Sequence, residues 1–353
     1  MNHKKTIIQS LDMLGQFLGQ FSNSEAKISN VVLHNDVFFN DFKQQLKFAQ
    51  QQNGWFSKDN VCYALKQWSK LLQKNNLENW LAAYNIPAAN KKTVAIIMAG
   101  NIPLVGFHDF LCALVSGHQV LVKQSSNDCH ILPYLAAYLM HLIPTLKSKI
   151  KFTEDKLKGI DAVIATGSDN TARYFEAYFK NIPAIIRKNR NSVCVLTGNE
   201  SYCELKGLAD DIFRYYGLGC RSVSKLFVPK DYNFDNFFKA IYDWHPILNS
   251  AKYANNYDYN KAVYLMSEYQ LIENGFLMLK QDVRYASPIA TLFYEFYENL
   301  ETLKSRIKSD VSLIQCVVSK NFITDEVAFG GTQYPKLSDY ADGLDTVDFL
   351  LKI

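Results

Sequence analysis

Short apolar runs that alternate with helical segments dominate the middle of this chain, and they restrict its fold more than any other feature. Thr93–Met98, Gln119–Lys123 and Asp161–Thr166 are mostly apolar, and the segments between them, such as Asp128–Leu142, have apolar residues at helical spacing. Runs of this length and composition are typical of strands buried in a parallel sheet. Strands that alternate with helices in this way predict an α/β fold with a doubly wound sheet.

The 353 residues are too many for one small core, and we expect four regions along them. Residues 1–90 have helical periodicity. Residues 91–198 form the doubly wound domain, which is expected to bind a dinucleotide, and residues 199–330 form a second α/β domain with the candidate nucleophile near its start. Residues 331–353 are a tail, whose apolar run Val347–Leu351 is strand-like and is expected to be available for pairing with another subunit.

Composition and charge exclude several classes of protein. The formal net charge is +4, and no long stripe of Lys and Arg points to nucleic acid; the short cluster Arg187–Arg190 is expected to be a solvated loop. No run reaches the roughly 18 apolar residues that span a bilayer. No apolar signal core follows the basic segment Met1–Lys5, so a cytoplasmic protein is expected. The seven cysteines are widely spaced and include no Cys-x-x-Cys pair, which favours free thiols and no metal site.

One cysteine lies on a glycine-rich turn. A helical run from Leu205 ends at Gly217, and Cys220 follows between Gly219 and Arg221, before an apolar strand. Glycines allow the backbone to approach a ligand closely, and an accessible thiolate is a nucleophile. Cys220 is therefore the candidate for covalent catalysis. The preceding acidic pair Asp210-Asp211 is expected to be a solvated helix face with a favourable helix-dipole contribution.

Two strand ends carry further candidates. Asn101 follows the first strand, where its amide could donate to an oxyanion or, equally, cap a helix that has Pro103 in its first turn. Gly167 and Ser168 open a helix directly after a strand, where backbone amides suit a pyrophosphate. They do not form the G-x-G-x-x-G fingerprint, and a plain capped helix start is an equal alternative. His108 and His245 are possible proton donors, although an ordinary structural histidine is the better interpretation of each.

Five segments in the same order resemble the aldehyde dehydrogenase superfamily and, within it, the LuxC-type acyl-CoA reductases. They are Met98–Leu104, Ser116–Ser126, Thr166–Ser168, Gly219-Cys220 with Ser224–Val228, and Phe329–Gly331. The resemblance implies a doubly wound cofactor domain and a second α/β catalytic domain. It also implies that Cys220 is the nucleophile and that Asn101 contributes to the oxyanion hole. Lys123 and Ser126 would lie at the adenosine ribose of the cofactor, and Gly167 and Ser168 at the start of the cofactor-binding helix.

Three departures from the superfamily pattern bear on the expected reaction: the first two narrow it, and the third counts against it. The Glu-Leu-Gly-Gly-Lys segment, whose Glu activates the hydrolytic water, corresponds to Ile186–Ser192, which has no carboxylate; this favours reduction over hydrolysis. Ser126 stands where NAD-preferring members have Glu, which leaves room for a 2′-phosphate beside Lys123 and favours NADPH over NADH. The Glu of Glu-x-Phe-Gly-Pro, which holds the nicotinamide ribose, is missing from Arg284–Pro288.

The resemblance implies NADPH-dependent reduction of a fatty acyl-CoA thioester to an aldehyde through a thioester on Cys220. The high aromatic content, 14%, suits an apolar acyl group. One alternative is a sister reductase that acts on an acyl phosphate such as γ-glutamyl phosphate. Another is a catalytically silent nucleotide-binding or assembly subunit. Superfamily members are usually dimers or tetramers, so a homo-oligomer is expected.

Overall fold

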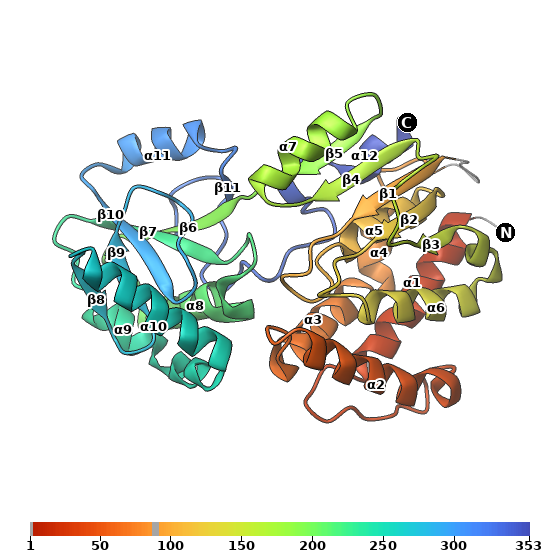
Figure 1. Ribbon diagram of the computed structural model, residues 1–353, viewed down its shortest axis with the longest axis horizontal. Helices are drawn as coiled ribbons and strands as arrows, with labels where there is room; N and C mark the ends of the chain where they lie inside the picture. Colours follow the sequence, from red (N-terminus) through yellow and green to blue (C-terminus); the bar gives the residue numbers. More distant parts are fainter. Residues whose placement is uncertain (1–2, 87–91) are drawn as a thin grey trace. The chain divides into compact units, whose positions relative to one another are not determined.

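The computed structural model describes residues 3–86 and 92–353 and divides into two compact units (Figure 1). Unit 1 comprises residues 1–188 and 336–353, and unit 2 comprises residues 189–335. The expected boundary at residue 90 lies outside the described residues. The expected boundary after residue 198 differs from the observed division, because strand β6 (Asn191–Val195) pairs with strands of unit 2.

Unit 1 is built on a five-stranded parallel sheet in the order β3-β2-β1-β4-β5. Its strands are β1 (Thr93–Ile97), β2 (Gln119–Lys123), β3 (Ile150–Phe152), β4 (Ala162–Thr166) and β5 (Ala184–Arg187). The order reverses between β1 and β4, as in a doubly wound sheet. The α/β class expected from the apolar runs is confirmed.

Helices cover both faces of this sheet (Figure 1). Phe175 and Phe179 of the α7 segment pack on one face, and the larger core on the other face includes residues from the N-terminal helices, α5, α6 and α12. The helices are α1 (His3–Gly19), α2 (Asn35–Gln52), α3 (Lys58–Leu71), α4 (Lys74–Leu81), α5 (Phe107–Val115), α6 (Ile131–Leu142), α7 (Asp169–Tyr178) and α12 (Thr346–Leu351), with 3₁₀ turns at Pro144–Ser148 and Ala341–Gly343. No helix among the described residues is long and apolar enough to cross a membrane.

The C-terminal run Val347–Leu351 lies in helix α12, so the strand expected there is wrong. The side chain of Asp345 accepts a hydrogen bond from the N–H of Asp348 at 2.9 Å and caps the helix. Val347 and Leu350 are buried, and α12 packs against α5. These apolar side chains complete the core of unit 1.

Arg187 is buried, and the solvated loop expected there is wrong for this residue. Its guanidinium donates to both carboxylate oxygens of Asp109, at 2.7 and 3.4 Å, and to the carbonyl oxygen of Ala341 at 2.6 Å and Thr346 Oγ1 at 3.0 Å. Arg187 therefore joins the end of β5 to helix α5 and to the C-terminal segment. Such a fork of donors is suited to a carboxylate and a backbone carbonyl together.

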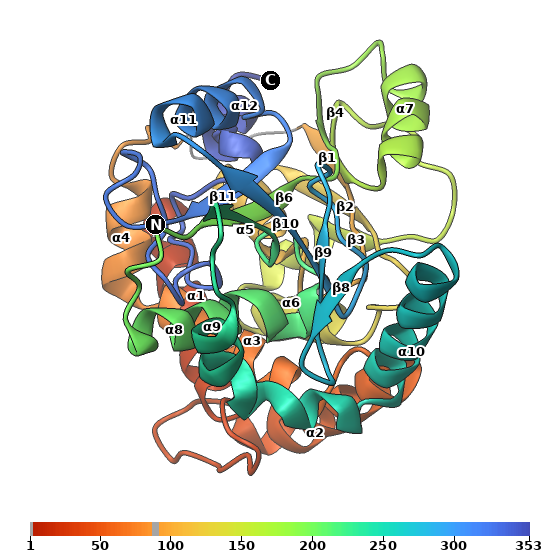
Figure 2. The same cartoon turned by 90° about the vertical axis from the view of Figure 1, so that its left-hand side faces the viewer.

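Unit 2 has a six-stranded sheet in the order β11-β6-β7-β10-β9-β8, parallel except for the β8–β9 pair (Figure 2). The strands are β6 (Asn191–Val195), β7 (Val223–Pro229), β8 (Leu271–Glu273), β9 (Met278–Gln281), β10 (Thr291–Tyr297) and β11 (Ile314–Val318). The helices are α8 (Tyr202–Phe213), α9 (Asp235–Ile241), α10 (Ala251–Met266) and α11 (Leu300–Ser309), with 3₁₀ turns at Arg214–Gly217 and Tyr242–Asn249. Helix α11 covers one face of the sheet, and α8, α9 and α10 lie on the other (Figures 1 and 2).

Candidate functional site

The candidate residues of unit 1 follow the carboxyl ends of three neighbouring strands. Asn101 follows β1, Lys123 and Ser126 lie at and after the end of β2, and Gly167 and Ser168 follow β4. In open α/β sheets, ligands bind at this edge, beside the point where the strand order reverses. The topology therefore places these side chains at the edge of the sheet where a dinucleotide is expected.

The loop that carries Asn101 is held closely against the loop after β2. A Cβ on Gly100 would lie 2.7 Å from Ser125 Oγ, so only glycine fits there without rearrangement. Asn53, which is buried just after α2, donates from Nδ2 to the carbonyl oxygens of Gly100 at 3.0 Å and Asn127 at 3.3 Å. The N-terminal helical region thus positions the Asn101 loop, a function that no local sequence signal indicates.

Helix α5 begins at Phe107, later than the start expected at Asn101 and Pro103. Leu104 has a φ of 60°, outside the right-handed helical region, and its N–H donates to Asp128 Oδ2 at 3.0 Å. The loop thus extends past Pro103, and Asn101 remains exposed rather than serving as the cap of α5. The exposed amide is compatible with a role at an oxyanion, which stays a prediction.

Asp128 is a buried carboxyl group beneath this loop. It is 6% exposed, and burial raises its pKa from 3.8 to about 7. Its Oδ1 atom has no hydrogen-bond partner among the described residues. A charged carboxylate is costly in such a place, so the fold favours the protonated form.

Asp128→Asn is expected to reduce the pH dependence of stability. The pKa of Asp128 is higher in the folded state than in the unfolded state, so its protonated form stabilises the fold. This stabilisation is full below about pH 4 and is lost as the pH rises from there through about 7. Between these two values, each pH unit lowers the free energy of unfolding by about 1.4 kcal/mol. Asparagine keeps an acceptor for the N–H of Leu104 without the charge. Urea unfolding at pH 5 and pH 8 should show a smaller loss of stability for the variant than for the wild type. Asp155→Asn, at an exposed carboxylate, is the control and should follow the wild type; equal losses in all three proteins would contradict the prediction.

Lys123 and Ser126 both take part in hydrogen bonds that involve backbone carbonyl oxygens. Lys123 Nζ donates to the carbonyl oxygens of Glu154 and Asp155, each at 2.9 Å. Ser126 is exposed, and its carbonyl oxygen accepts from the side chain of Gln52. Contact of Lys123 and Ser126 with a cofactor stays a prediction.

Ser168 caps helix α7. Its Oγ accepts from the N–H of Thr171 at 3.3 Å, and a Cβ on Gly167 would lie 3.0 Å from Thr171 Cβ. The capped helix start is therefore confirmed. A pyrophosphate at the same helix terminus stays a prediction, and it does not exclude the cap.

The turn that carries Cys220 is built from left-handed residues. Tyr215, Tyr216 and Gly217 have φ values of 55°, 59° and 74°, so the chain leaves the end of α8 sharply. Cys220 is exposed at the end of this turn, and its carbonyl oxygen accepts from Ser192 Oγ at 2.9 Å. Left-handed backbone at two consecutive tyrosines is unusual and costs free energy, so the surrounding structure must hold this turn in place.

Asp211 is fully buried, and the solvated helix face expected there is wrong for this residue. Its Oδ2 accepts from the N–H of Gly330 at 2.6 Å, and its Oδ1 accepts from the N–H and Oγ1 of Thr332 at 2.9 and 2.8 Å. Burial raises the pKa of Asp211 to about 6, against these hydrogen bonds. The Phe329–Gly331 segment is thereby fixed against α8.

The strand after Cys220 contains a buried lysine. Lys225 Nζ donates to Glu295 Oε2 at 2.6 Å and to the carbonyl oxygen of Val283 at 2.8 Å, and burial lowers the pKa of Lys225. Arg284 instead is exposed and donates to Asp282 at 2.6 Å. The segment expected to replace the ribose-binding Glu segment thus begins with a guanidinium that is paired with a neighbouring carboxylate.

The two candidate histidines differ in their surroundings. The Nε2 atom of His108 lies 3.0 Å from the carbonyl oxygen of Leu337, and burial lowers the pKa of the ring. His245 stacks against Tyr242 with ring centroids 5.6 Å apart. His108 is thus held in the core of unit 1, whereas His245 is exposed, and a proton-donor role for either stays a prediction.

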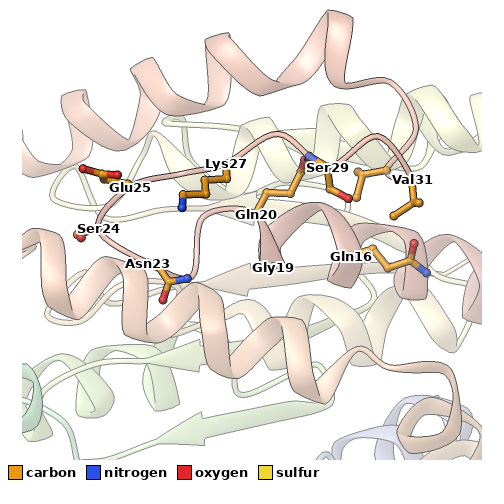
Figure 3. Close-up of a pocket in the computed structure, with 10 residues that line it drawn as sticks. Gln16, Gly19, Gln20, Asn23, Ser24, Glu25, Lys27, Ser29 and Val31 are labelled. Carbon is orange, nitrogen blue, oxygen red and sulfur yellow. The ribbon is translucent and has the colours of Figure 1, made fainter.

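An open cavity of about 720 Å³ lies in the N-terminal part of unit 1, between the end of α1 and the loop that follows (Figure 3). It is lined mainly by polar side chains, including Gln16, Gln20, Asn23 and Lys27. None of the candidate residues lines it. Within residues 3–86 and 92–353, no group of His, Cys, Asp and Glu side chains could hold a metal ion.

Solved structures with the same fold are aldehyde dehydrogenases. Aldehyde dehydrogenase 21 from Physcomitrella patens, solved with the reaction product succinate, has a TM-score of 0.67 and 10% identity, over 99% of this chain and 87% of that one. KauB from Pseudomonas aeruginosa has a TM-score of 0.65 and 13% identity, over 90% and 72%. The NAD⁺ complex of the Bacillus cereus enzyme has a TM-score of 0.59 and 12% identity, over 95% and 82%.

Sequence comparison gives the family. No curated protein matches the chain. The family model described as acyl-CoA reductase (LuxC) matches residues 3–241, which is more than half of the chain and includes Asn101, Lys123, Gly167 and Cys220. The chain therefore belongs to the LuxC family of acyl-CoA reductases, on an aldehyde dehydrogenase fold.

Proposed function

We propose that the protein reduces a fatty acyl-CoA thioester to the aldehyde with NADPH, through a thioester on Cys220. The observation that carries the proposal is the exposed thiol of Cys220 on a strained left-handed turn, within the segment that the family model matches. An accessible thiol is suited to nucleophilic attack once it is deprotonated.

The edge of the unit 1 sheet at the carboxyl ends of its strands supports a dinucleotide site. Lys123 supplies a cation at the end of β2, and α7 begins at a capped terminus with glycine before the cap. By family likeness, Lys123 and Ser126 would contact the adenosine ribose, and Gly167 and Ser168 the pyrophosphate. Ser126 offers no carboxylate to repel a 2′-phosphate, which supports NADPH over NADH.

Cys220 would carry the acyl group between two half-reactions. Its thiolate forms a C–S bond with the acyl carbon, and the bond from that carbon to the CoA sulfur breaks, so that CoA leaves and takes up the one proton of the net reaction. When bound, NADPH supplies the hydride that reduces the thioacyl group to a thiohemiacetal. Collapse of the thiohemiacetal then releases the aldehyde and returns the thiolate to Cys220.

We assign two donors to the oxyanion that forms in each half-reaction. One is the backbone N–H of Cys220 and the other is the side-chain amide of Asn101, the role that its family position implies. Loss of one such donor typically raises the barrier by about 3 kcal/mol. Asn101→Ala is therefore expected to lower kcat about 100-fold. The Kd for NADPH should change little, so measuring both quantities separates an effect on catalysis from an effect on cofactor binding.

The test is consumption of NADPH with a panel of acyl-CoA esters of increasing chain length, with NADH and an acyl phosphate as parallel substrates. We expect turnover with long-chain esters, faster with NADPH, and an acyl adduct on the Cys220 peptide when acyl-CoA is added without cofactor. Turnover of the acyl phosphate but of no acyl-CoA ester would show that the substrate is an acyl phosphate. Binding of NADPH without turnover of either substrate would indicate a silent subunit.

Two further expectations belong to this proposal. We place the enzyme in the cytoplasm, and we expect a homo-oligomer by likeness to the superfamily alone. The C-terminal segment no longer supports the oligomer, because α12 buries its apolar residues within unit 1.

A further inference from the structure

Asp211 is a carboxylate that unit 2 buries in the helix leading to the nucleophile. It is 0% exposed and accepts three hydrogen bonds, all from uncharged donors of Gly330 and Thr332. Burying a carboxylate is costly even when it is hydrogen-bonded. A residue of this kind needs an explanation beyond filling the core, since an apolar side chain fills space at lower cost.

The hydrogen bonds to Asp211 hold the loop of residues 330–332 close to helix α8. A Cβ on Gly207 would lie 3.0 Å from the carbonyl carbon and oxygen of Phe329, and a Cβ on Gly330 would lie 3.2 Å from Gly207 Cα. Gly330 also has a φ of 81°. The loop and the helix therefore meet backbone to backbone, and the three hydrogen bonds to Asp211 set the position of Thr332.

The position of Thr332 also affects the candidate nucleophile, because Thr332 contacts the residue next to Cys220. The carbonyl oxygen of Thr332 accepts from the Nε atom of Arg221, the residue directly after Cys220. Ser192 Oγ donates to the carbonyl oxygen of Cys220 itself. Hydrogen bonds thus run from Asp211 through Thr332 to Arg221, and they hold the exposed turn in addition to the hydrogen bond from Ser192.

We propose that Asp211 is a positioning residue for Cys220, acting through Thr332 and Arg221. The inference rests on the proposed function in one respect, that Cys220 is the nucleophile. A small displacement of a reacting group can lower a rate about 100-fold, which is why a distant anchor affects the chemistry. Arg221 holds the turn through its hydrogen bond to the carbonyl oxygen of Thr332, and Asp211 holds Thr332 in place.

The experiment is a double-mutant cycle on the rate at which Cys220 is modified. Asp211→Asn and Arg221→Met are each expected to slow acylation by acyl-CoA roughly 10- to 100-fold. The double variant should be no slower than the slower single one, because both changes break the same chain. Asp210→Asn is the matched control: Asp210 is partly exposed and takes no part in the hydrogen bonds from Asp211 to Arg221, so the rate of this variant should equal that of the wild type.

A second readout separates this proposal from the proposed function. Alkylation of Cys220 by iodoacetamide, followed by mass spectrometry with exposed Cys203 as internal reference, needs neither acyl-CoA nor cofactor. If the wild type takes no acyl group but is alkylated, the proposed function fails and the alkylation rates still decide the positioning role. Wild-type rates in Asp211→Asn, or additive effects in the double variant, would overturn the role of Asp211. If Asp211→Asn does not fold, Thr332→Val, which removes one of the three donors to Asp211, replaces it, and its rate should lie between those of the wild type and Arg221→Met.

Discussion

Replacing Cys220 with alanine is expected to abolish the reduction of acyl-CoA while the folded structure remains intact. The thiol is the only group proposed to bond to the acyl carbon, and removal of a catalytic nucleophile lowers kcat by about 10³-fold or more. Because Cys220 is exposed, alanine leaves no cavity in the core. The measurement is NADPH consumption with the best ester of the panel, together with the melting temperature and the Kd for NADPH, both of which should be unchanged.

Cys203→Ala is the matched control for this prediction. Cys203 is a second exposed thiol of unit 2, in the first turn of α8. Its replacement should leave activity at the wild-type level. If Cys220→Ala retained more than a few per cent of the activity, or if Cys203→Ala lost it, Cys220 would not be the nucleophile.

Replacing Arg187 with methionine is expected to destabilise unit 1 by about 3–5 kcal/mol, the usual cost of leaving one member of a buried ion pair without its partner. The side chains of Arg187 and Asp109 are 6% and 9% exposed. The variant leaves Asp109 charged and buried, and it also removes donors from Ala341 and Thr346. Unfolding in urea, followed by fluorescence, measures the change.

The adjacent residue offers a control. Lys188 forms an ion pair with Glu176 at 2.7 Å, but both side chains are about half exposed. Lys188→Met should therefore cost no more than about 1 kcal/mol. The double variant Arg187→Met with Asp109→Leu should recover much of the lost stability, since no charge is then left buried. Equal stabilities of the Arg187 and Lys188 variants would show that the buried pair contributes little.

The sheet of unit 1 can be predicted from the sequence because its strands are apolar runs of five residues or so between turn residues. The helix after β1 begins later than the sequence predicts, for a physical reason. Asn101 and Pro103 are favourable at a helix start, but the N–H of Leu104 donates to Asp128, and Leu104 has a left-handed φ. Local signals describe the two residues correctly and cannot reveal a partner in the loop after another strand.

The run Val347–Leu351 is compatible with a strand because a short apolar run does not distinguish strand from helix. The signal that indicates helix α12 is Asp345, which stands three residues before Asp348 and caps its N–H. Charged residues show the same limit more clearly. Arg187 and Asp211 look like surface residues, because their partners Asp109 and Thr332 are far away in the sequence.

The sequence locates the segments that form the candidate site but not the residues that hold these segments in place. The structure places Asn101, Lys123 and Gly167 at the ends of adjacent strands, as the alternation of strands and helices predicts, and their roles remain proposals. Asn53 carries no motif, yet it joins the loop that carries Asn101 to the loop after β2. Hydrogen bonds between distant segments depend on the completed fold, so residue patterns do not contain them.

The return of residues 336–353 to unit 1 determines the order in which the protein can mature on the ribosome. Unit 2 is one continuous stretch, so all its strands have been synthesised once residue 335 is made. Unit 1 begins first but lacks helix α12 until then, and the guanidinium of Arg187 lacks Ala341 and Thr346. During the synthesis of unit 2, helix α12 is therefore not yet available to pack against α5, and of these two units the one whose synthesis begins earlier is completed later.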